Sequence, residues 1–198
     1  MLSEDDLAPT WIEQFDRWMD DALRAGIAEP YGMVVSTASP GGRPSSRSVL
    51  LRGVSKAGFV FHTNYHSRKG GELAANPAVS LLMPWYDLGR QVVVDGRAER
   101  LSSQESDAYW AARPQASRLS ALASPQSQVI GSREELEVRR ATLVDRYGEG
   151  PVPRPSHWGG FRVAPTSVEF WQAGADRMHD RLRYRLEGGA WVVERLAP

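Results

Sequence analysis

Near the start of the chain, apolar positions recur at the spacing of an amphipathic helix. The residues that share this face are Trp11, Phe15, Trp18, Met19 and Ala22. Thr10 and Glu13 have capping-box spacing, and Gly26 is a typical C-terminal stop. We therefore expect a helix over residues 10–25, preceded by an N-terminal arm over residues 1–9.

From Gly32 onward, short apolar or alternating runs are bounded by turn residues, which predicts β-strands. The expected strands cover residues 33–37, 46–52, 59–63, 79–83, 91–100, 161–164, 167–171, 181–186 and 191–196. The expected further helices cover residues 67–75, 102–113 and 132–147, the last of them opened by a capping box at Ser132–Glu135.

Most consecutive strands are joined by short turns, such as Ser39–Gly42, whereas parallel strands would need helical crossovers. The pattern therefore predicts an α+β protein, an antiparallel β-barrel or sandwich with peripheral helices. No repeat, low-complexity tract or linker divides the 198 residues, so we expect a single domain.

Composition narrows the possible functions. Lys plus Arg and Asp plus Glu both number 24, and this balance argues against non-specific nucleic-acid binding. The absence of cysteine excludes disulfides, thiolate nucleophiles and cysteine-ligated metals. Met1–Asp6 is acidic and lacks the apolar core of a signal peptide, and no apolar run is long enough to cross a bilayer. We expect a cytoplasmic protein with no membrane partner.

The segment after Glu169-Phe170-Trp171-Gln172 is rich in charged and proton-transferring side chains. If residues 177–181 are extended, Arg177, His179 and Arg181 share one face, because side chains alternate along a strand. That face could bind a planar anionic ligand. A solvated edge strand is the alternative interpretation.

Three further groups are candidates for binding anions. Arg47 and Arg52, five residues apart, point to opposite faces of an undistorted strand unless a bulge brings them together. Ser67-Arg68-Lys69 opens a predicted helix, where free backbone N–H groups favour an anion, although such charges are often only solvated.

The third group, Tyr109, Arg113 and Ser117, has a spacing of four and suits a phosphate. Spacing alone slightly favours a surface helix face on which Arg113 caps its own helix. His62 and His66 have metal-ligand spacing but no third ligand, so we predict no metal site.

Many short motifs occur in one order from about residue 26 to the end of the chain. They are Arg47-Ser48-Val49-Leu50-Leu51-Arg52, His62-Thr63, Ser67-Arg68-Lys69, Asn76-Pro77, Pro84-Trp85, Arg90-Gln91, Gln126-Ser127, Trp158-Gly159-Gly160, Glu169-Phe170-Trp171-Gln172, Arg177-Met178-His179-Asp180-Arg181 and Arg195-Leu196-Ala197-Pro198. With these motifs in this order, the chain resembles the pyridoxine/pyridoxamine 5′-phosphate oxidase family.

The resemblance implies a split β-barrel homodimer with FMN at the subunit interface. The implied FMN contacts are Arg47, Ser48, Val49, Leu50, His62, Thr63, Arg68, Lys69, Gln91, Gln126, Ser127, Trp171 and Arg181. The implied contacts to the substrate phosphate are Arg52, Tyr109, Arg113 and Ser117. Arg177 and His179 would lie near the pyridine ring, orient the substrate and assist proton movement at C4′.

The implied reaction oxidises the C4′ alcohol or amine of pyridoxine or pyridoxamine phosphate, with hydride transfer to FMN and reoxidation by dioxygen to give hydrogen peroxide. Two alternatives are an oxidase of the phenazine-biosynthesis type, acting on a tricyclic dihydro compound, and a non-catalytic cofactor-binding protein. The chain departs from the family pattern with Arg52 in place of Lys and Glu29 in place of Asp. The family's N-terminal segment that closes over the substrate has no counterpart in Met1–Pro9.

Overall fold

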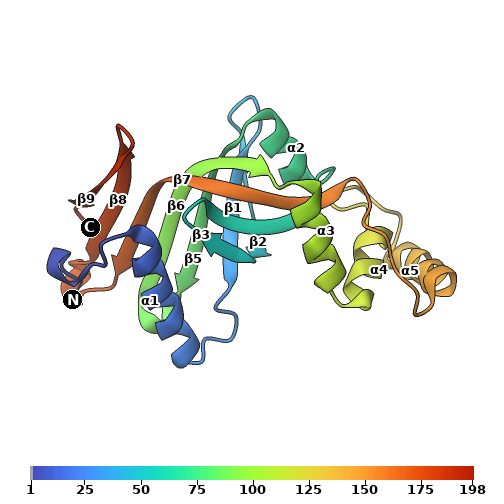
Figure 1. Ribbon diagram of the computed structural model, residues 1–198, viewed down its shortest axis with the longest axis horizontal. Helices are drawn as coiled ribbons and strands as arrows, with labels where there is room; N and C mark the ends of the chain where they lie inside the picture. The colour runs from blue at the N-terminus through green and yellow to red at the C-terminus, as the bar shows by residue number, and fades with distance from the viewer. Residues whose placement is uncertain (1) are drawn as a thin grey trace.

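The computed structural model describes residues 2–198, and its centre is one curled sheet of nine strands (Figure 1). The strands are β1 (Gly32–Ala38), β2 (Pro44–Leu50), β3 (Gly53–Ser55), β4 (Gly58–Asn64), β5 (Ala78–Trp85), β6 (Arg90–Arg100), β7 (Trp158–Gln172), β8 (Asp180–Glu187) and β9 (Ala190–Arg195). Neighbours follow the order β2-β1-β5-β6-β7-β4-β3, and β8 pairs with β7 and β9. Every pairing is antiparallel, so the predicted α+β class with an antiparallel split barrel is confirmed.

The long strand β7 connects the two parts of the sheet. Along one edge it pairs with β6, and along the other it pairs first with β4 and then with β8. The ladder with β6 shifts by one residue beside Gly96, where a Cβ would lie only 2.3 Å from the carbonyl oxygen of Ala164. The prediction of two separate strands here was wrong, because Pro165 interrupts the apolar pattern at a bulge within one continuous strand.

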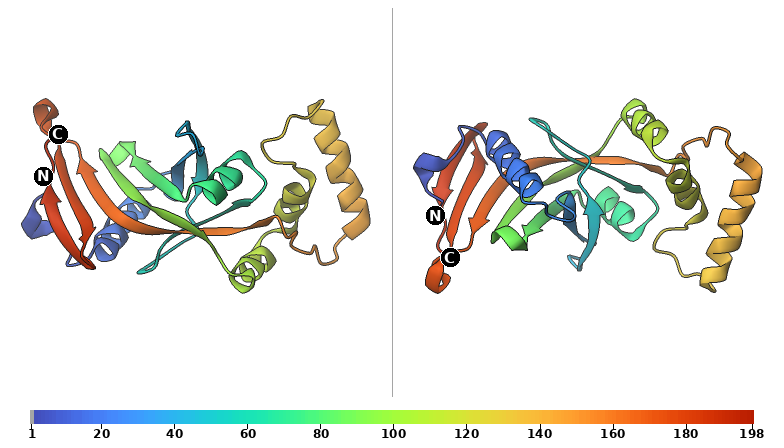
Figure 2. Two further views of the ribbon diagram at one scale, coloured as in Figure 1. Left: turned by 90° about the horizontal axis from the view of Figure 1, so that it is seen from above. Right: turned by 90° about the horizontal axis from the view of Figure 1, so that it is seen from below.

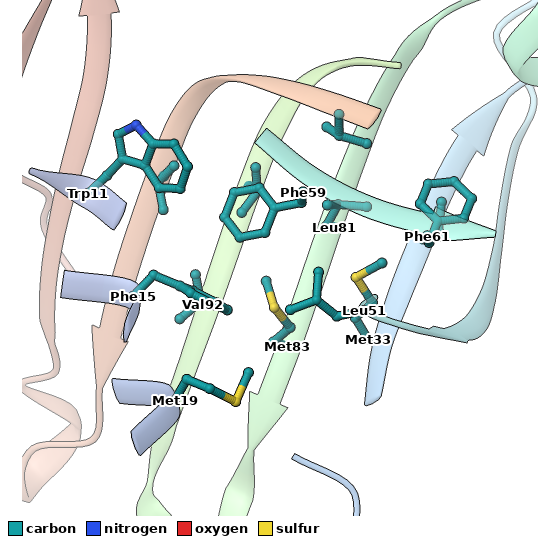
Figure 3. Packing of buried hydrophobic residues seen from close by; sticks show 14 of the residues in the cluster. Trp11, Phe15, Met19, Met33, Leu51, Phe59, Phe61, Leu81, Met83 and Val92 are labelled. Atoms are coloured by element: carbon teal, nitrogen blue, oxygen red, sulfur yellow. The ribbon is translucent and has the colours of Figure 1, made fainter. Parts of the chain in front are cut away.

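Helix α1 (Trp11–Arg24) covers the apolar face of the sheet, as its sequence pattern predicts (Figure 3). The ring centroids of Trp11 and Phe15 each lie 5.2 Å from that of Phe59 in β4. Both hydrogen bonds of the predicted capping box between Thr10 and Glu13 are present. The predicted helix is therefore confirmed, and it closes the core on this side.

The remaining helices are α2 (Arg68–Ala75), α3 (Ser103–Ala112), α4 (Gln115–Ala123) and α5 (Arg133–Tyr147). Three of them were predicted, whereas α4 was missed. Ser132 accepts a hydrogen bond from the Glu135 backbone, but the Glu135 carboxylate accepts from Gly131, so only half of the predicted capping box forms. Figure 2 shows α3, α4 and α5 at one end of the molecule and β8 and β9 at the other.

The second predicted strand, 46–52, was placed two residues too late. Strand β2 ends at Leu50, after which Leu51 N–H still donates to Tyr31 and Arg52 N–H donates to Val60 of β4. The chain therefore leaves the β1 ladder and joins β4 within two residues. Arg52 is exposed at this transition.

The N-terminal arm lies against β8. Leu2 and Ala8 are buried, and the Tyr184 hydroxyl donates to the Ala8 carbonyl over 2.6 Å. The Leu2 N–H donates to the Asp180 carboxylate over 2.8 Å. Among the helices of residues 2–198, none is both long and apolar enough to span a bilayer.

Phe59 lies fully buried between α1 and the sheet, so Phe59→Ala should lower the free energy of unfolding by about 3–5 kcal/mol. Urea denaturation of the purified protein measures this change. Val129→Ala removes a fully exposed apolar side chain and should change stability by less than about 0.5 kcal/mol. A loss below about 1 kcal/mol for Phe59→Ala would contradict the packing described for this core.

Candidate functional site

A cavity of about 300 Å³, here called the central cavity, lies among β2, β4, α2, α3 and α4. Its lining residues are Ser48, Val49, Leu50, Arg52, His62, Thr63, Lys69, Tyr109, Arg113, Pro114, Ser117 and Gln126. All of these except Pro114 were site predictions from the sequence. A second cavity of about 470 Å³ shares His62, Arg113 and Ser117 with it and continues along α4.

Lys69 places an ammonium group in the central cavity. Its side chain is buried, and Nζ donates to Thr63 Oγ1 over 3.0 Å and to Gln126 Oε1 over 3.2 Å. No carboxylate of residues 2–198 forms an ion pair with it. Burial, and then the charge of Arg47, lower the pKa of Lys69 to about 8. Ser127, next to Gln126, is exposed and has a φ of 70°.

His62 forms an aromatic stack on one side of the cavity. Its ring lies 3.7 Å from the Tyr109 ring with an interplanar angle of 12°, and 5.5 Å from the Trp158 ring. Both ring nitrogens are buried and find no hydrogen-bond partner within residues 2–198. Burial, followed by the charges of Arg113 and Arg52, lowers the pKa of His62 to about 4. The imidazole is therefore neutral at pH 7, and its ring contributes an aromatic face to the stack.

Arg113 does not lie on a continuous helix face with Tyr109 and Ser117, so the interpretation as one surface helix was wrong. Helix α3 ends at Ala112, Arg113 is extended, and Pro114 precedes α4. The guanidinium lies 4.5 Å from the ring centre of Trp158 and donates to the Ser117 carbonyl over 3.1 Å. The break between the helices still leaves Tyr109, Arg113 and Ser117 lining one cavity.

Arg47 and Arg68 converge on Glu72, a residue that the sequence prediction missed. The buried carboxylate accepts from Thr37 over 2.5 Å, Ser45 over 2.6 Å, Arg68 Nε over 2.9 Å and Arg47 Nη2 over 3.3 Å. Burial alone would raise the pKa of Glu72, but these hydrogen bonds lower it to about 2. The four-residue spacing of Arg68 and Glu72 on a helix was the available signal.

The other predicted site residues lie at the far end of β7. Trp171 pairs across the sheet with Gln91 on one side and Arg181 on the other, and its ring lies 4.7 Å from that of His179. Trp158, beside the central cavity, begins the same 15-residue strand. At roughly 3.3 Å per residue, the strand separates the two groups by several tens of ångströms (Figure 1).

The extended conformation considered for residues 177–181 is not present. Ala175–Arg177 form a 3₁₀ turn in which Asp176 and Arg177 have φ values of 52° and 62°, and β8 begins only at Asp180. The turn closes tightly, because a Cβ on Gly174 would lie 1.9 Å from the Met178 carbonyl oxygen. Arg177, His179 and Arg181 therefore do not share a strand face.

Arg181 is engaged within the chain. Its guanidinium donates to both carboxylate oxygens of Glu169, over 2.7 and 3.1 Å, and to the Ala197 carbonyl over 3.0 Å. The His179 Nδ1 accepts from the Gly174 N–H over 3.2 Å, which leaves its other ring nitrogen available. Among residues 2–198, no cluster of three or more His, Asp or Glu has the arrangement of a metal site.

The donor set of the central cavity fits a planar ligand that carries a phosphate. Lys69 supplies a buried positive charge without a carboxylate partner among residues 2–198, and Arg52 and Arg113 supply guanidinium groups. Val49 and Leu50 of β2 supply an apolar surface of the same cavity. FMN has both the phosphate and the planar ring that such a cavity can bind.

Comparison with solved structures identifies the class of fold. The pyridoxamine 5′-phosphate oxidase-related, FMN binding protein of Nostoc punctiforme PCC 73102 superposes with a TM-score of 0.74 at 18% identity, covering 98% of this chain and 100% of that one. PhzG from Burkholderia lata 383, solved with tetrahydrophenazine-1-carboxylic acid, gives a TM-score of 0.94 at 34% identity, covering 100% and 98% of the two chains. The protein therefore has the split-barrel fold of these two solved structures.

Sequence comparison identifies the family. The pyridoxamine 5′-phosphate oxidase model matches residues 19–145, and the pyridoxine 5′-phosphate oxidase C-terminal dimerisation region matches residues 158–198. The pyridoxine/pyridoxamine 5′-phosphate oxidases of Salinispora arenicola and Rubrobacter xylanophilus are 54% and 55% identical, each over 100% of this chain and 90% or 91% of the relative. The chain belongs to the pyridoxamine 5′-phosphate oxidase family, which confirms the resemblance.

Proposed function

We propose that this protein is an FMN-dependent oxidase that converts pyridoxamine or pyridoxine 5′-phosphate to pyridoxal 5′-phosphate. The observation that carries the proposal is the presence of two cationic positions in one cavity, Lys69 at one and Arg52 with Arg113 at the other. Two phosphate-bearing molecules, a cofactor and a substrate, would use both. A cytoplasmic location remains part of the proposal.

The cofactor phosphate would bind at Lys69. The ammonium is already oriented by Thr63 and Gln126, so little side-chain entropy remains to be lost on binding. Arg68 follows the N-cap of α2 and adds a second charge, and Ser127 is exposed beside Gln126. These contacts support binding of the phosphate end of FMN at the junction of β4 and α2.

The substrate phosphate would bind among Arg52, Tyr109, Arg113 and Ser117. Arg113 is oriented by the face of Trp158 and by the Ser117 carbonyl, so its remaining donors are presented in a defined direction. Arg52 is exposed at the cavity rim and has no ion pair within the described chain. Two guanidiniums and two hydroxyls suit a phosphate dianion.

When bound, FMN would supply the two-electron acceptor and return the electrons to dioxygen, with hydrogen peroxide as product. The chain's own contribution is to position the substrate C4′ beside the flavin and to exclude water from the cavity. Val49 and Leu50 would contact the ring system, while Arg177 and His179 would orient the pyridine and assist proton movement at C4′.

We infer that each complete site needs two copies of the chain. Arg177 and His179 lie at the end of β7 opposite the central cavity, so one chain cannot bring both groups to one substrate. The matched dimerisation region, residues 158–198, contains Trp171, Arg177, His179 and Arg181. In a homodimer with FMN at the interface, the partner copy would supply this second group of side chains.

A phenazine-biosynthesis type of oxidation is the second candidate. It is favoured by the similarity to PhzG over the whole chain and by a cavity of about 490 Å³ on the other side of Arg52 and Tyr109, partly lined by Phe15 and Met19. A tricyclic carboxylate could place its ring there and its charge on Arg52. Identities of 54% and 55% to pyridoxine/pyridoxamine 5′-phosphate oxidases, against 34% to PhzG, favour the first candidate.

The decisive experiment incubates the FMN-loaded protein with pyridoxine or pyridoxamine 5′-phosphate in air and follows hydrogen peroxide and pyridoxal 5′-phosphate. We expect both products from at least one of the two substrates. Retention of FMN without any turnover would identify a binding protein. Oxidation of a tetrahydrophenazine carboxylate alone would establish the second candidate.

Arg113→Ala should raise the KM for the phosphorylated substrate by about tenfold or more, because a charge-assisted hydrogen bond contributes roughly 1.5–3 kcal/mol. Steady-state kinetics of peroxide formation measure the change. Arg139→Ala on α5, which removes an exposed arginine paired with Glu135, is the matched control. An unchanged KM with a lower melting temperature would show that Arg113 has only a structural role.

Lys69→Ala should weaken FMN binding, and the loss should depend on pH. Only the protonated amine attracts the phosphate, and the pKa of Lys69 in the empty cavity is about 8. Wild-type affinity should therefore be steady between pH 7 and about pH 8 and then fall by up to about tenfold per pH unit. The variant should lack this fall.

Quenching of flavin fluorescence measures both affinities across the pH range. Lys56→Ala changes the chain's other lysine, which is exposed in the turn between β3 and β4, and should retain the wild-type profile. The same fall above pH 8 in Lys69→Ala would assign the pH dependence to another group.

A further inference from the structure

Glu72 is the most completely hydrogen-bonded carboxylate near the central cavity, and no step proposed above uses it. It lies on α2, 8% exposed, one helical turn after Arg68. Two hydroxyls and two guanidiniums donate to it. A buried carboxylate is costly to desolvate, and these donors offset that cost.

Arg47 is fixed on the inner side of Glu72. Its Nη1 donates to the Val35 carbonyl over 3.2 Å and to Thr37 over 2.6 Å, and its Nη2 donates to Ser45 over 2.5 Å and to Glu72. The terminal nitrogens are thus engaged within the sheet. This guanidinium supports the carboxylate and has only Nε left to offer a ligand.

Arg68 lies on the outer side of Glu72. Its Nε donates to Glu72 over 2.9 Å, while neither terminal nitrogen has a partner among residues 2–198, and half of the side chain is exposed. The preceding residue, Ser67, caps α2 and lies 3.5 Å from the ammonium of Lys69. The free end of Arg68 is therefore attached to the same helix start as the cavity lysine.

We propose that Glu72 is a positioning residue, whose carboxylate orients Arg68 so that its free terminal nitrogens bind the FMN phosphate next to Lys69. The inference rests on the proposed function, because it assigns the phosphate of FMN to this place. Arg47, Thr37 and Ser45 fix the carboxylate from the other side. Glu72 itself touches neither cofactor nor substrate.

A purely electrostatic role and a positioning role of Glu72 predict opposite changes in FMN affinity when the carboxylate is removed. Arg47, Arg68 and Lys69 carry three positive charges and Glu72 one negative charge, so neutralising Glu72 makes the region more positive. If the carboxylate acted through charge alone, its removal would tighten the binding of a dianion. If it positions Arg68, its removal weakens that binding.

The test uses Glu72→Gln in the full-length protein stripped of flavin, with FMN and riboflavin as probes. Riboflavin has the same ring system but no phosphate. We expect the affinity for FMN to fall by about tenfold while the affinity for riboflavin changes by less than about twofold. Glu137→Gln, which breaks the comparable pair with Arg133 on α5, should change neither affinity.

A double variant shows whether the effect passes through Arg68. In an Arg68→Met background, Glu72→Gln should weaken FMN binding by less than about threefold, because the group that it orients is absent. A full tenfold effect in that background overturns the proposal. Unchanged or tighter FMN binding by Glu72→Gln, or an equal loss of FMN and riboflavin, also overturns it.

Ser45→Ala provides an independent variant if Glu72→Gln does not fold. It removes one donor to the carboxylate and one acceptor of Arg47 without changing any charge. We expect a smaller, roughly threefold loss of FMN affinity and unchanged riboflavin affinity. If the wild-type protein itself does not prefer FMN over riboflavin, the proposed function fails and this inference fails with it.

Discussion

The continuous hydrogen bonding of β7 is the constraint on which the rest of this structure depends. One strand pairs with β6 along its length and changes its second neighbour from β4 to β8. The change is possible because Gly96 lets the two backbones approach where the register shifts. The central cavity and Trp171 consequently lie at opposite ends of one continuous strand, so a site that used both would need a second chain.

Much of the fold was predictable because its local signals agree with its packing. The apolar face of α1 and the capping hydroxyl of Thr10 both predict the same helix, and most strands show simple alternation of apolar and polar residues. The failures occur where tertiary contacts override local pattern. Pro165 resembles a strand end but lies at a bulge, and Arg177 lies in a turn whose closure depends on Gly174 approaching Met178.

The residues that line the candidate site could be predicted from the sequence, but their arrangement in space could not. Lys69, Arg113 and His62 were all selected from the sequence, yet their environments come from residues distant in the chain. Trp158 lies against Arg113 and His62, and Gln126 contacts Lys69 across a separation of 57 residues. The role of Glu72 could not be predicted from the sequence, because its two hydroxyl partners, Thr37 and Ser45, come from different strands.

The unpaired ammonium of Lys69 has a consequence for the lifetime of the protein. Without an anion, this buried charge opposes folding, and a ligand that binds only the folded chain stabilises it by mass action. If FMN binds at Lys69 as proposed, chains without it would be less stable and more open to proteases. The supply of the cofactor would then affect the abundance of the protein as well as its activity.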